Sequence, residues 1–346
     1  MARVTPDQLR QMKARGERIP MLTAYDYPTA QILDAAGLPI LLVGDSMGMV
    51  VLGHPTTLPV TVDDIIRHAQ AVVRGTEHAL IVADLPFGAF QVSTEETMRA
   101  AVRIMKEAQP QAVKLEGGRR VAASVRALTE AGIPVMGHVG LTPQSVNVTG
   151  GFRVQGKTEQ AARILLDDVA ALEDAGAFAV VLELVPAELS RLITERTSIP
   201  TIGIGAGPYC DGEVQVVHDI LGLFPDFTPR HTRHFGELGA AMRQAAESYV
   251  AEVRDRSFPT AAQSAKIDAA VIAALRADDA DNDADNDADD TADSRDSGDA
   301  TSAAVDAQPH NGAQAKGRAA DQSASQAEPQ IEPEADGYAP PKTKKG

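Results

Sequence analysis

The sequence predicts an α/β protein whose body is a single (βα)8 barrel of the TIM type, and three observations lead to that prediction. Short apolar, β-branched runs alternate with stretches of helical character through the first 277 residues. The runs are almost continuously apolar, which is typical of parallel strands buried on both faces of a sheet. Seven or eight such units in about 260 residues match the size of a (βα)8 barrel.

The expected elements follow one another along the chain, each apolar run ending in polar residues and leading into a helical stretch. The strands are expected at Met21–Asp26, Ile40–Ser46, Leu80–Leu85, Ala112–Gly117, Pro134–Leu141, Ala179–Val185 and Ile199–Gly207, with a weak eighth near His218–Leu223. The helices are expected at Thr29–Ala36, Thr61–Arg74, Thr94–Ala108, Arg119–Ala131, Thr158–Ala175 and Ala187–Arg196, with Phe235–Val253 as the closing helix.

The junctions between helices and strands support the same arrangement. The phrases AAGLPI, EAGIPV and RTSIPT recur where a helix gives way to a strand. Glycine is the expected C-terminal cap of the helix in the first two phrases, and proline favours the extended backbone with which the next strand begins. The alternative is an open, doubly wound sheet, which would call for a glycine-rich phosphate loop after its first strand. The first strand here ends in TAYDYP, which contains no glycine.

The C-terminal part of the chain differs in composition from the barrel. From Asp278 onward it holds 17 acidic and 6 basic residues, so −11 of the net charge of −16 resides there. Mutual repulsion and the scarcity of apolar residues predict a disordered acidic tail. We therefore expect a catalytic barrel over residues 1–260, a transition segment with helical potential over residues 261–277, and the tail over residues 278–346.

Composition also excludes several classes of protein. The single cysteine, Cys210, excludes an internal disulfide framework and a multi-cysteine zinc site. No apolar run reaches the length of a membrane span, and the N-terminus lacks the apolar core of a signal peptide. The body is not basic and aromatic residues are few, which argues against a nucleic-acid partner. The expected location is the cytoplasm.

The expected strand ends hold an unusual set of side chains. One acidic residue at a strand end is commonly a helix N-cap, but four carboxylates at four strand ends would repel one another unless a cation lay among them. In a barrel of this kind the carboxyl ends of the strands form the active site. The set comprises Asp45, Ser46, Asp84, Lys114, Glu116, His138 and Glu183.

Oxygen ligands without cysteine favour a hard cation such as Mg²⁺, which leaves coordination positions open for a substrate. A small 2-oxo acid could chelate such an ion, which would stabilise the enolate formed beside the carbonyl. Lys114 is then a cation for the substrate carboxylate, although a Schiff-base lysine and a buried ion pair are alternatives. His138 could equally be a hydrogen-bonded histidine behind the site.

Eight short motifs, taken together, resemble the ketopantoate hydroxymethyltransferase family. The resemblance runs from about Thr5 to Pro259, and its specificity comes from the order and spacing of the motifs rather than from any one of them. They are Gly44–Gly48 (GDSMG), Gly53–Thr61 (GHPTTLPVT), Ala83–Pro86 (ADLP), Val113–Gly118 (VKLEGG), Gly137–Ser145 (GHVGLTPQS), Gly150–Gly156 (GGFRVQG), Leu182–Pro186 (LELVP) and Ile202–Gly207 (IGIGAG).

The resemblance implies a Mg²⁺-dependent enzyme of pantothenate biosynthesis. It would transfer a hydroxymethyl group from 5,10-methylenetetrahydrofolate to 3-methyl-2-oxobutanoate through a metal-stabilised enolate, giving 2-dehydropantoate. The resemblance also implies a homo-oligomer, with a decamer as the assembly it suggests.

The motifs carry roles to individual residues. GDS implies that Asp45 contacts both metal and substrate and that Ser46 contacts substrate, and ADLP implies the double role for Asp84. VKLEGG implies a substrate-binding Lys114 and a metal-associated Glu116. LELVP implies Glu183 as the general base, and His138 in GHVGL would support the site.

Two departures and two rival interpretations accompany the resemblance. The acidic tail and the segment Pro229–Phe235 (PRHTRHF) depart from the family pattern, but neither includes a named site residue. The first rival is a lyase or mutase of the isocitrate lyase and phosphoenolpyruvate mutase type, which would act without folate. The second is a non-catalytic scaffold whose acidic tail binds a basic partner.

Overall fold

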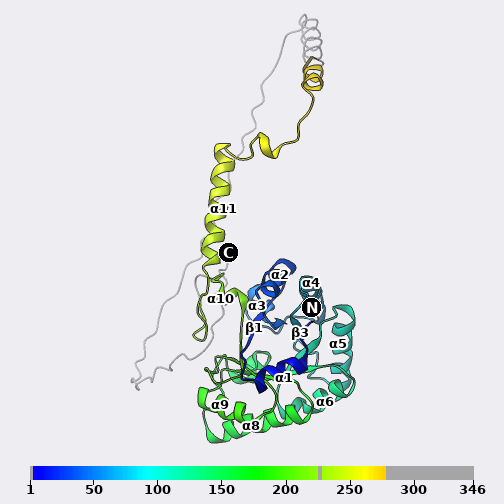
Figure 1. Cartoon of the computed structure of the whole chain (residues 1–346), viewed down its shortest axis with the longest axis vertical. Helices are drawn as coiled ribbons and strands as arrows, with labels where there is room; N and C mark the ends of the chain where they lie inside the picture. The colour runs from blue at the N-terminus through cyan, green and yellow to red at the C-terminus, as the bar shows by residue number, and fades with distance from the viewer. Residues whose placement is uncertain (1–2, 225–227, 278–346) are drawn as a thin grey trace, which may run out of the picture. The chain divides into compact units, whose positions relative to one another are not determined.

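The computed structural model describes residues 3–224 and 228–277, and within them it confirms the (βα)8 barrel (Figure 1). Eight parallel strands close in chain order, each pairing with its neighbours in sequence, and β1 pairs with β8. The strands are β1 (Ile19–Thr23), β2 (Ile40–Val43), β3 (Leu80–Asp84), β4 (Ala112–Glu116), β5 (Val135–Gly140), β6 (Ala179–Glu183), β7 (Thr201–Ile204) and β8 (Gly212–Gln215).

Helices follow most of the strands and surround the barrel (Figure 1). The α-helices are α1 (Pro6–Ala14), α2 (Tyr27–Ala35), α3 (Met47–Val50), α4 (Val62–Arg74), α5 (Thr94–Glu107), α6 (Ala122–Glu130), α7 (Val146–Thr149), α8 (Glu159–Asp174), α9 (Ala187–Arg196), α10 (Val217–Ile220) and α11 (Leu238–Asp255). Short 3₁₀ turns lie at η1 (Arg119–Val121), η2 (Pro143–Ser145) and η3 (Ala261–Gln263).

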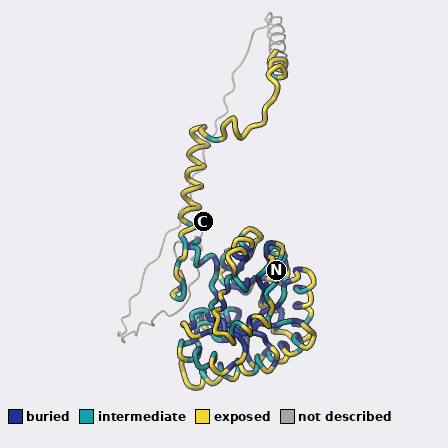
Figure 2. The backbone as a smooth tube through the Cα atoms, viewed as in Figure 1, coloured by how far each residue is buried: buried dark blue, intermediate teal, exposed yellow. Residues whose placement is uncertain are grey.

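Apolar side chains of the barrel are buried in two layers. Inward-facing residues such as Met21, Ile40 and Leu80 fill the barrel, and outward-facing residues such as Leu41 and Ile81 pack under the helices. The strands therefore form the buried centre, and the exposed faces belong to the helices (Figure 2). Burial of each large aliphatic side chain stabilises the fold by roughly 1.5–3 kcal/mol. This double burial explains why the strands are almost continuously apolar.

The prediction for the eighth strand was wrong. The strand lies at Gly212–Gln215, where it pairs with β1 and β7, and the helix α10 occupies Val217–Ile220 instead. The segment GEVQ has no apolar, β-branched run, so closure of the barrel rather than local propensity makes it a strand. Helix α1 was not predicted either; it begins with a capping box formed by Thr5 and Gln8.

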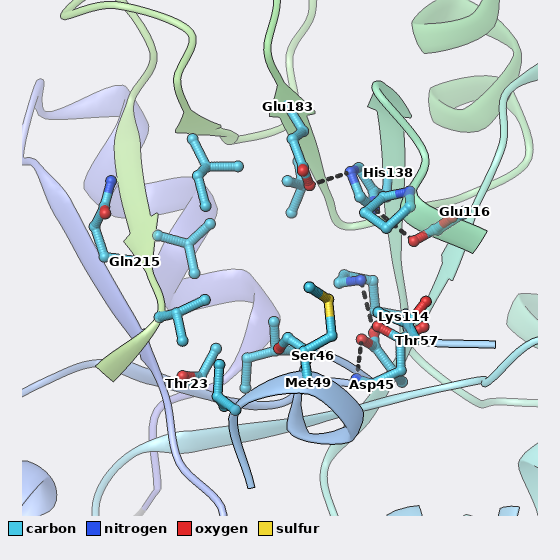
Figure 3. A pocket seen from close by; sticks show the side chains of 18 of the residues that line it. Thr23, Asp45, Ser46, Met49, Thr57, Lys114, Glu116, His138, Glu183 and Gln215 are labelled. Carbon is cyan, nitrogen blue, oxygen red and sulfur yellow. Dashed lines mark hydrogen bonds and ion pairs between the residues drawn. The ribbon is translucent and has the colours of Figure 1, made fainter. Parts of the chain in front are cut away.

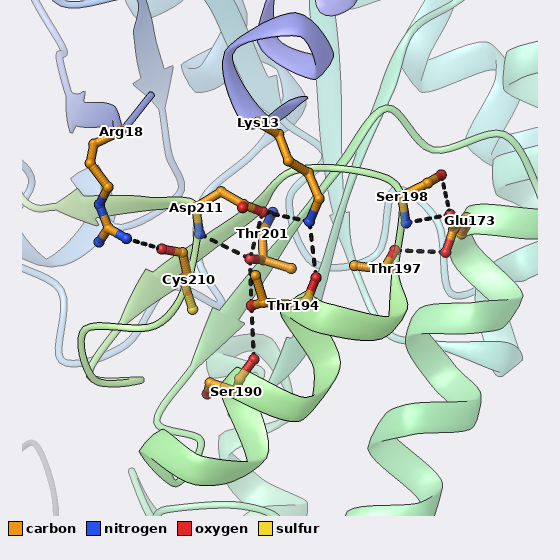
Figure 4. Close-up of polar contacts among 10 residues, drawn as sticks. All are labelled: Lys13, Arg18, Glu173, Ser190, Thr194, Thr197, Ser198, Thr201, Cys210 and Asp211. Carbon is orange, nitrogen blue, oxygen red and sulfur yellow. Dashed lines mark hydrogen bonds and ion pairs between the residues drawn. The ribbon is translucent and has the colours of Figure 1, made fainter. Parts of the chain in front are cut away.

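A polar network ties the amino-terminal side of the closing strands to α1 (Figure 4). Lys13 Nζ lies 2.8 Å from Asp211 Oδ2 and donates to the carbonyl oxygen of Thr194 at 3.1 Å. The Asp211 carboxylate also accepts from the backbone N–H of Thr201 at 2.8 Å. Since β1, β7 and β8 meet here, the network fixes the seam at which the barrel closes.

The second compact unit of the chain begins at Glu247, within α11. It contains η3, and residues 269–277 are also helical. The predicted acidic tail, residues 278–346, lies outside the described residues, and the domain boundaries at 260 and 277 remain a prediction. Within the described part of the chain, no helix combines the length and apolarity that crossing a bilayer demands.

Candidate active site

One pocket collects the predicted site residues at the carboxyl ends of the strands (Figure 3). All seven of them line it, although they come from four different strands, β3 to β6, and the turn that follows β2. Along a strand, alternate residues face the same side. Asp84, Lys114, His138 and Glu183 therefore stand directly above the inward-facing apolar residues Val82, Ala112, Met136 and Val181.

An ion pair lies at the centre of the pocket. Lys114 Nζ is 2.7 Å from Asp84 Oδ1, and both side chains are almost fully buried. The second Asp84 oxygen accepts the backbone N–H of Asp45 at 3.0 Å, which fixes the turn after β2. Burial alone would lower the pKa of Lys114, but the carboxylates of Asp84, Glu116 and Asp45 raise it above its ordinary value. Lys114 therefore stays a cation.

Gln144, in the 3₁₀ turn after β5, connects three parts of the site. Its side-chain Nε2 donates to Asp45 Oδ2 at 2.8 Å and to the carbonyl oxygen of Leu85 at 3.0 Å. Its backbone N–H donates to Glu116 Oε2 at 3.1 Å. Gln144 thus orients two carboxylates at once. The sequence prediction missed this role, although Gln144 stands within the motif GHVGLTPQS.

His138 lies between two carboxylates. Its Nε2 is 3.1 Å from Glu183 Oε2, and its Nδ1 is 3.6 Å from Glu116 Oε1. Burial, and then the positive charge of Lys114, lower the pKa of His138, so the ring is neutral at neutral pH. A neutral imidazole protonated on Nε2 directs that N–H toward the Glu183 carboxylate, 3.1 Å away.

Backbone geometry brings Glu183 to the mouth of the barrel. Gly140 on β5 is the register partner of Glu183, and a Cβ there would lie 2.2 Å from the Glu183 carbonyl oxygen. Directly after the carboxylate, Leu184 has a φ of 46°, which non-glycine residues seldom adopt. Such strained residues cluster at functional sites, where the surrounding structure holds them.

Ser46 is anchored by an aromatic residue that the sequence prediction also missed. Its Oγ lies 2.8 Å from the hydroxyl of Tyr25, which is buried after β1. Burial raises the pKa of Tyr25 above its ordinary value, so the phenol stays protonated. Gly44 makes room for this arrangement, since a Cβ there would lie 2.9 Å from Ser46 Oγ.

The electrostatics of the carboxylates suit a cation. Burial, and then repulsion from Asp84, raise the pKa of Asp45 to about 7. Burial and repulsion from Asp45 likewise raise the pKa of Glu116 well above its usual range. Within residues 3–224 and 228–277, however, no three His, Cys, Asp or Glu side chains converge as a preformed metal cage. The donors that the pocket does offer are carboxylate oxygens, which fit a hard cation such as Mg²⁺ that takes few protein ligands and keeps several waters.

The pocket has two unlike walls. The charged wall is contributed by β3 to β6 and the turn after β2, and consists of Asp45, Asp84, Lys114, Glu116, His138 and Glu183. Strands β1, β7 and β8 contribute Thr23, Ile204, Val214 and Gln215, which we call the uncharged wall, and the titratable residues Asp219 and His231 line the pocket from the segments after β8. Figure 3 shows Glu183, His138 and Lys114 away from Thr23 and Gln215. The arrangement can hold an anionic head group on one side and an alkyl group on the other.

Comparison with known proteins gives consistent matches. A family model described as ketopantoate hydroxymethyltransferase matches residues 3–261. A 3-methyl-2-oxobutanoate hydroxymethyltransferase of Dehalococcoides mccartyi is 55% identical, covering 79% of this chain and 97% of that protein. One of Gluconacetobacter diazotrophicus is 58% identical, covering 77% and 95%. A solved phosphoenolpyruvate phosphomutase of Streptomyces platensis subsp. rosaceus is similar in fold alone, with a TM-score of 0.50 and 14% identity over 81% of this chain and 98% of that one.

Proposed function

Because the chain belongs to the ketopantoate hydroxymethyltransferase family, we propose that its pocket holds 3-methyl-2-oxobutanoate while a one-carbon unit is added to it. The chain is an enzyme, a hydroxymethyltransferase. The observation that carries the proposal is the charged wall, with four carboxylates, one lysine and one neutral histidine around a single pocket. Burying charged side chains costs free energy, so a non-catalytic scaffold would not be expected to contain such a group.

Lys114 binds the substrate carboxylate in this proposal. One N–H of its ammonium is directed at Asp84, and the remaining donors can serve the substrate. Ser46, held by Tyr25, is a second substrate contact. The branched alkyl group of the substrate then meets Ile204 and Val214 of the uncharged wall.

Glu183 is the proposed general base. Its carboxylate reaches the pocket with 16% of the side chain exposed, and His138 Nε2 lies 3.1 Å from it. We propose that Glu183 removes the proton from C3 of the 2-oxo acid, which leaves a carbon nucleophile. His138 then acts as a positioning residue, since its contact is with Glu183 rather than with the reacting carbon.

Asp45 and Asp84 would hold a Mg²⁺ ion, and Glu116 would act beside them. Each of these oxygens that already accepts a hydrogen bond keeps a second lone pair for a ligand. When bound, the ion would supply Lewis-acid stabilisation of the negative charge that develops on the 2-oxo acid. Gln144 keeps the Asp45 carboxylate oriented for this purpose.

The proposed one-carbon donor is 5,10-methylenetetrahydrofolate. Bonds form from the methylene carbon to C3 of the substrate and to the oxygen of a water molecule, and both bonds from that carbon to the folate nitrogens N5 and N10 break. The proton taken from C3 and one proton of the water balance the charge on the nitrogens, so the products are 2-dehydropantoate and tetrahydrofolate. A cytoplasmic location remains a prediction from composition, and a homo-oligomeric, decameric assembly remains a prediction from the family resemblance.

The test is turnover by the purified full-length protein. We expect 2-dehydropantoate to form only when 3-methyl-2-oxobutanoate and 5,10-methylenetetrahydrofolate are both present, and excess chelator to abolish it until Mg²⁺ is restored. Cleavage or rearrangement of a 2-oxo acid without folate would support the lyase or mutase interpretation instead. Full turnover in excess chelator would show that the metal proposal is wrong.

A further inference from the structure

We propose that the hydroxyl of Thr57 is a further substrate-binding group, which donates a hydrogen bond to an oxygen of the bound 2-oxo acid. The identity of the ligand rests on the proposed function above. Thr57 belongs to the loop between α3 and α4, and its side chain lines the pocket. The motif that contains it, GHPTTLPVT, supplied no site residue on the basis of sequence.

The hydroxyls that line the pocket differ in their partners. Thr23 Oγ1 accepts the backbone N–H of Val217 at 2.9 Å, and Ser46 Oγ is 2.8 Å from the Tyr25 hydroxyl. Thr57 is 3% exposed, and its Oγ1 has no hydrogen-bond partner among the residues that the structure describes. Buried hydroxyls are almost always hydrogen-bonded, because leaving one unpaired costs free energy. This cost would be relieved by a ligand that brings an acceptor.

The loop holds Thr57 close to the segment that carries Asp45 and Ser46. Helix α3 follows these two residues directly, and Gly48 within it lies against the loop. A Cβ on Gly48 would be 2.6 Å from Val60 Cγ2 and 3.7 Å from Thr57 Cα. The backbone N–H of His54 also donates to the carbonyl oxygen of Gly48 at 2.7 Å. Thr57 is thus held in place by the turn of chain that positions the predicted metal and substrate residues.

The chemistry of the ligand decides the direction of the hydrogen bond. A 2-oxo acid carries three oxygen acceptors and no donor, so the Thr57 hydroxyl must be the donor. Thr57 and Lys114 both line the pocket. A neutral donor in the same pocket as the ammonium group adds direction to the binding of an anion, which a point charge alone does not provide.

The experiment compares Thr57→Val with Thr57→Ser. Valine keeps the shape of threonine and removes the hydroxyl, whereas serine keeps the hydroxyl. Binding of 3-methyl-2-oxobutanoate is measured by calorimetry in the presence of Mg²⁺, and the melting temperature is measured without ligand. We expect Thr57→Val to weaken binding by about 10- to 100-fold, as loss of a hydrogen bond to a charged group does. Thr57→Ser should recover most of the affinity.

The melting temperature separates a binding role from a structural one. Because the hydroxyl has no partner in the described fold, Thr57→Val should melt at or above the wild-type temperature. The matched control is Thr23→Val, which removes the hydroxyl that accepts the backbone N–H of Val217 and should lower the melting temperature below that of wild type. If Thr57→Val does not fold, Thr57→Ala, which also lacks the hydroxyl, replaces it in both measurements.

Two outcomes would overturn the inference. The first is a Thr57→Val protein that binds the acid as tightly as wild type, and the second is a fall in melting temperature like that of the control. If the wild-type protein itself does not bind 3-methyl-2-oxobutanoate, the proposed function fails instead. The two failures are therefore distinguishable.

Discussion

Replacing Gln144 with methionine tests whether this residue organises the charged wall. The two side chains are similar in length and volume, so Gln144→Met mainly removes polar atoms. The substitution removes two hydrogen bonds, the one of 2.8 Å to the Asp45 carboxylate and the one of 3.0 Å to the Leu85 carbonyl oxygen. The backbone N–H that Gln144 donates to Glu116 remains. The effect should therefore fall on the turns after β2 and β3.

The size of the effect follows from these two contacts. A hydrogen bond to a buried carboxylate contributes about 1.5–3 kcal/mol, and an unpaired buried carbonyl costs about 1–3 kcal/mol. Asp45 can offset part of its loss by taking up a proton, because its pKa is already about 7. We expect destabilisation of about 2–5 kcal/mol, which corresponds to a fall in melting temperature of roughly 5–15 °C.

Two measurements check this prediction. The melting temperature is recorded in chelator at neutral pH, and turnover is titrated with Mg²⁺. We expect loss of the residue that orients Asp45 to weaken the apparent affinity for Mg²⁺ by about 10- to 100-fold. The matched control is Gln91→Met, which removes the bond from Gln91 Nε2 to Gln144 Oε1 at 3.0 Å and the acceptor of the Gly88 N–H at 2.7 Å and the Phe90 N–H at 3.4 Å, but leaves the bond from Gln144 to Asp45 in place. That variant should keep the wild-type dependence on Mg²⁺, whatever its effect on the melting temperature.

A Gln144→Met protein with unchanged melting temperature and unchanged Mg²⁺ dependence would refute this reasoning. It would mean that the Asp45 carboxylate is oriented without its amide partner. Destabilisation without any change in Mg²⁺ dependence would restrict Gln144 to a structural role at the Leu85 carbonyl.

Two further predictions concern the base and the pH dependence. Glu183→Gln keeps the shape of the base but cannot accept a proton, so exchange of the C3 hydrogen with deuterated solvent should slow by roughly 10²-fold or more. A Glu183→Gln protein that exchanges this hydrogen at the wild-type rate would show that another residue is the base, with His138 the first candidate. In chelator Asp45 and Glu213 should each contribute a loss of stability as pH rises from about 4 to about 7, because the pKa of Asp45 is raised from 3.8 to about 7 and that of Glu213 from 4.5 to about 7, so the folded state favours their neutral forms. His138, His218 and His231, whose pKa values are lowered, act in the opposite sense, so the measurement compares wild type with Glu213→Gln. The melting temperature of Glu213→Gln relative to wild type should rise as pH is stepped through this range, and a fall would contradict the sign.

The sequence was sufficient to predict the barrel and the members of the charged wall. Apolar runs indicated the first seven strands. A polar residue at the end of such a run is expected at the mouth of the barrel, because all parallel strands end there and the lengths of the loops do not change that position. Asp84, Lys114 and Glu183 were therefore predicted to lie together although they are far apart in the chain. Their contacts bear this out as far as position is concerned, with Lys114 and Asp84 2.7 Å apart.

The parts that were missed depend on contacts between distant segments. Strand β8 exists because β1 and β7 flank it, and nothing local in GEVQ indicates a strand. Gln144 and Thr57 lie outside the strands, where neither helical nor strand periodicity indicates which way a side chain points. Tyr25 resembles any buried aromatic residue until its hydroxyl is seen 2.8 Å from Ser46.

The two walls of the pocket separate the reaction from the choice of substrate. Every member of the charged wall lies between residues 45 and 183, whereas the uncharged wall comes from the first strand and the last two. Under the proposed function, the shape of the alkyl compartment can therefore be altered at Ile204 and Val214 without replacing any member of the charged wall. A combinatorial library limited to Ile204 and Val214, which leaves the bond from the Val217 N–H to Thr23 intact, is the starting point for enzymes that hydroxymethylate longer or bulkier 2-oxo acids.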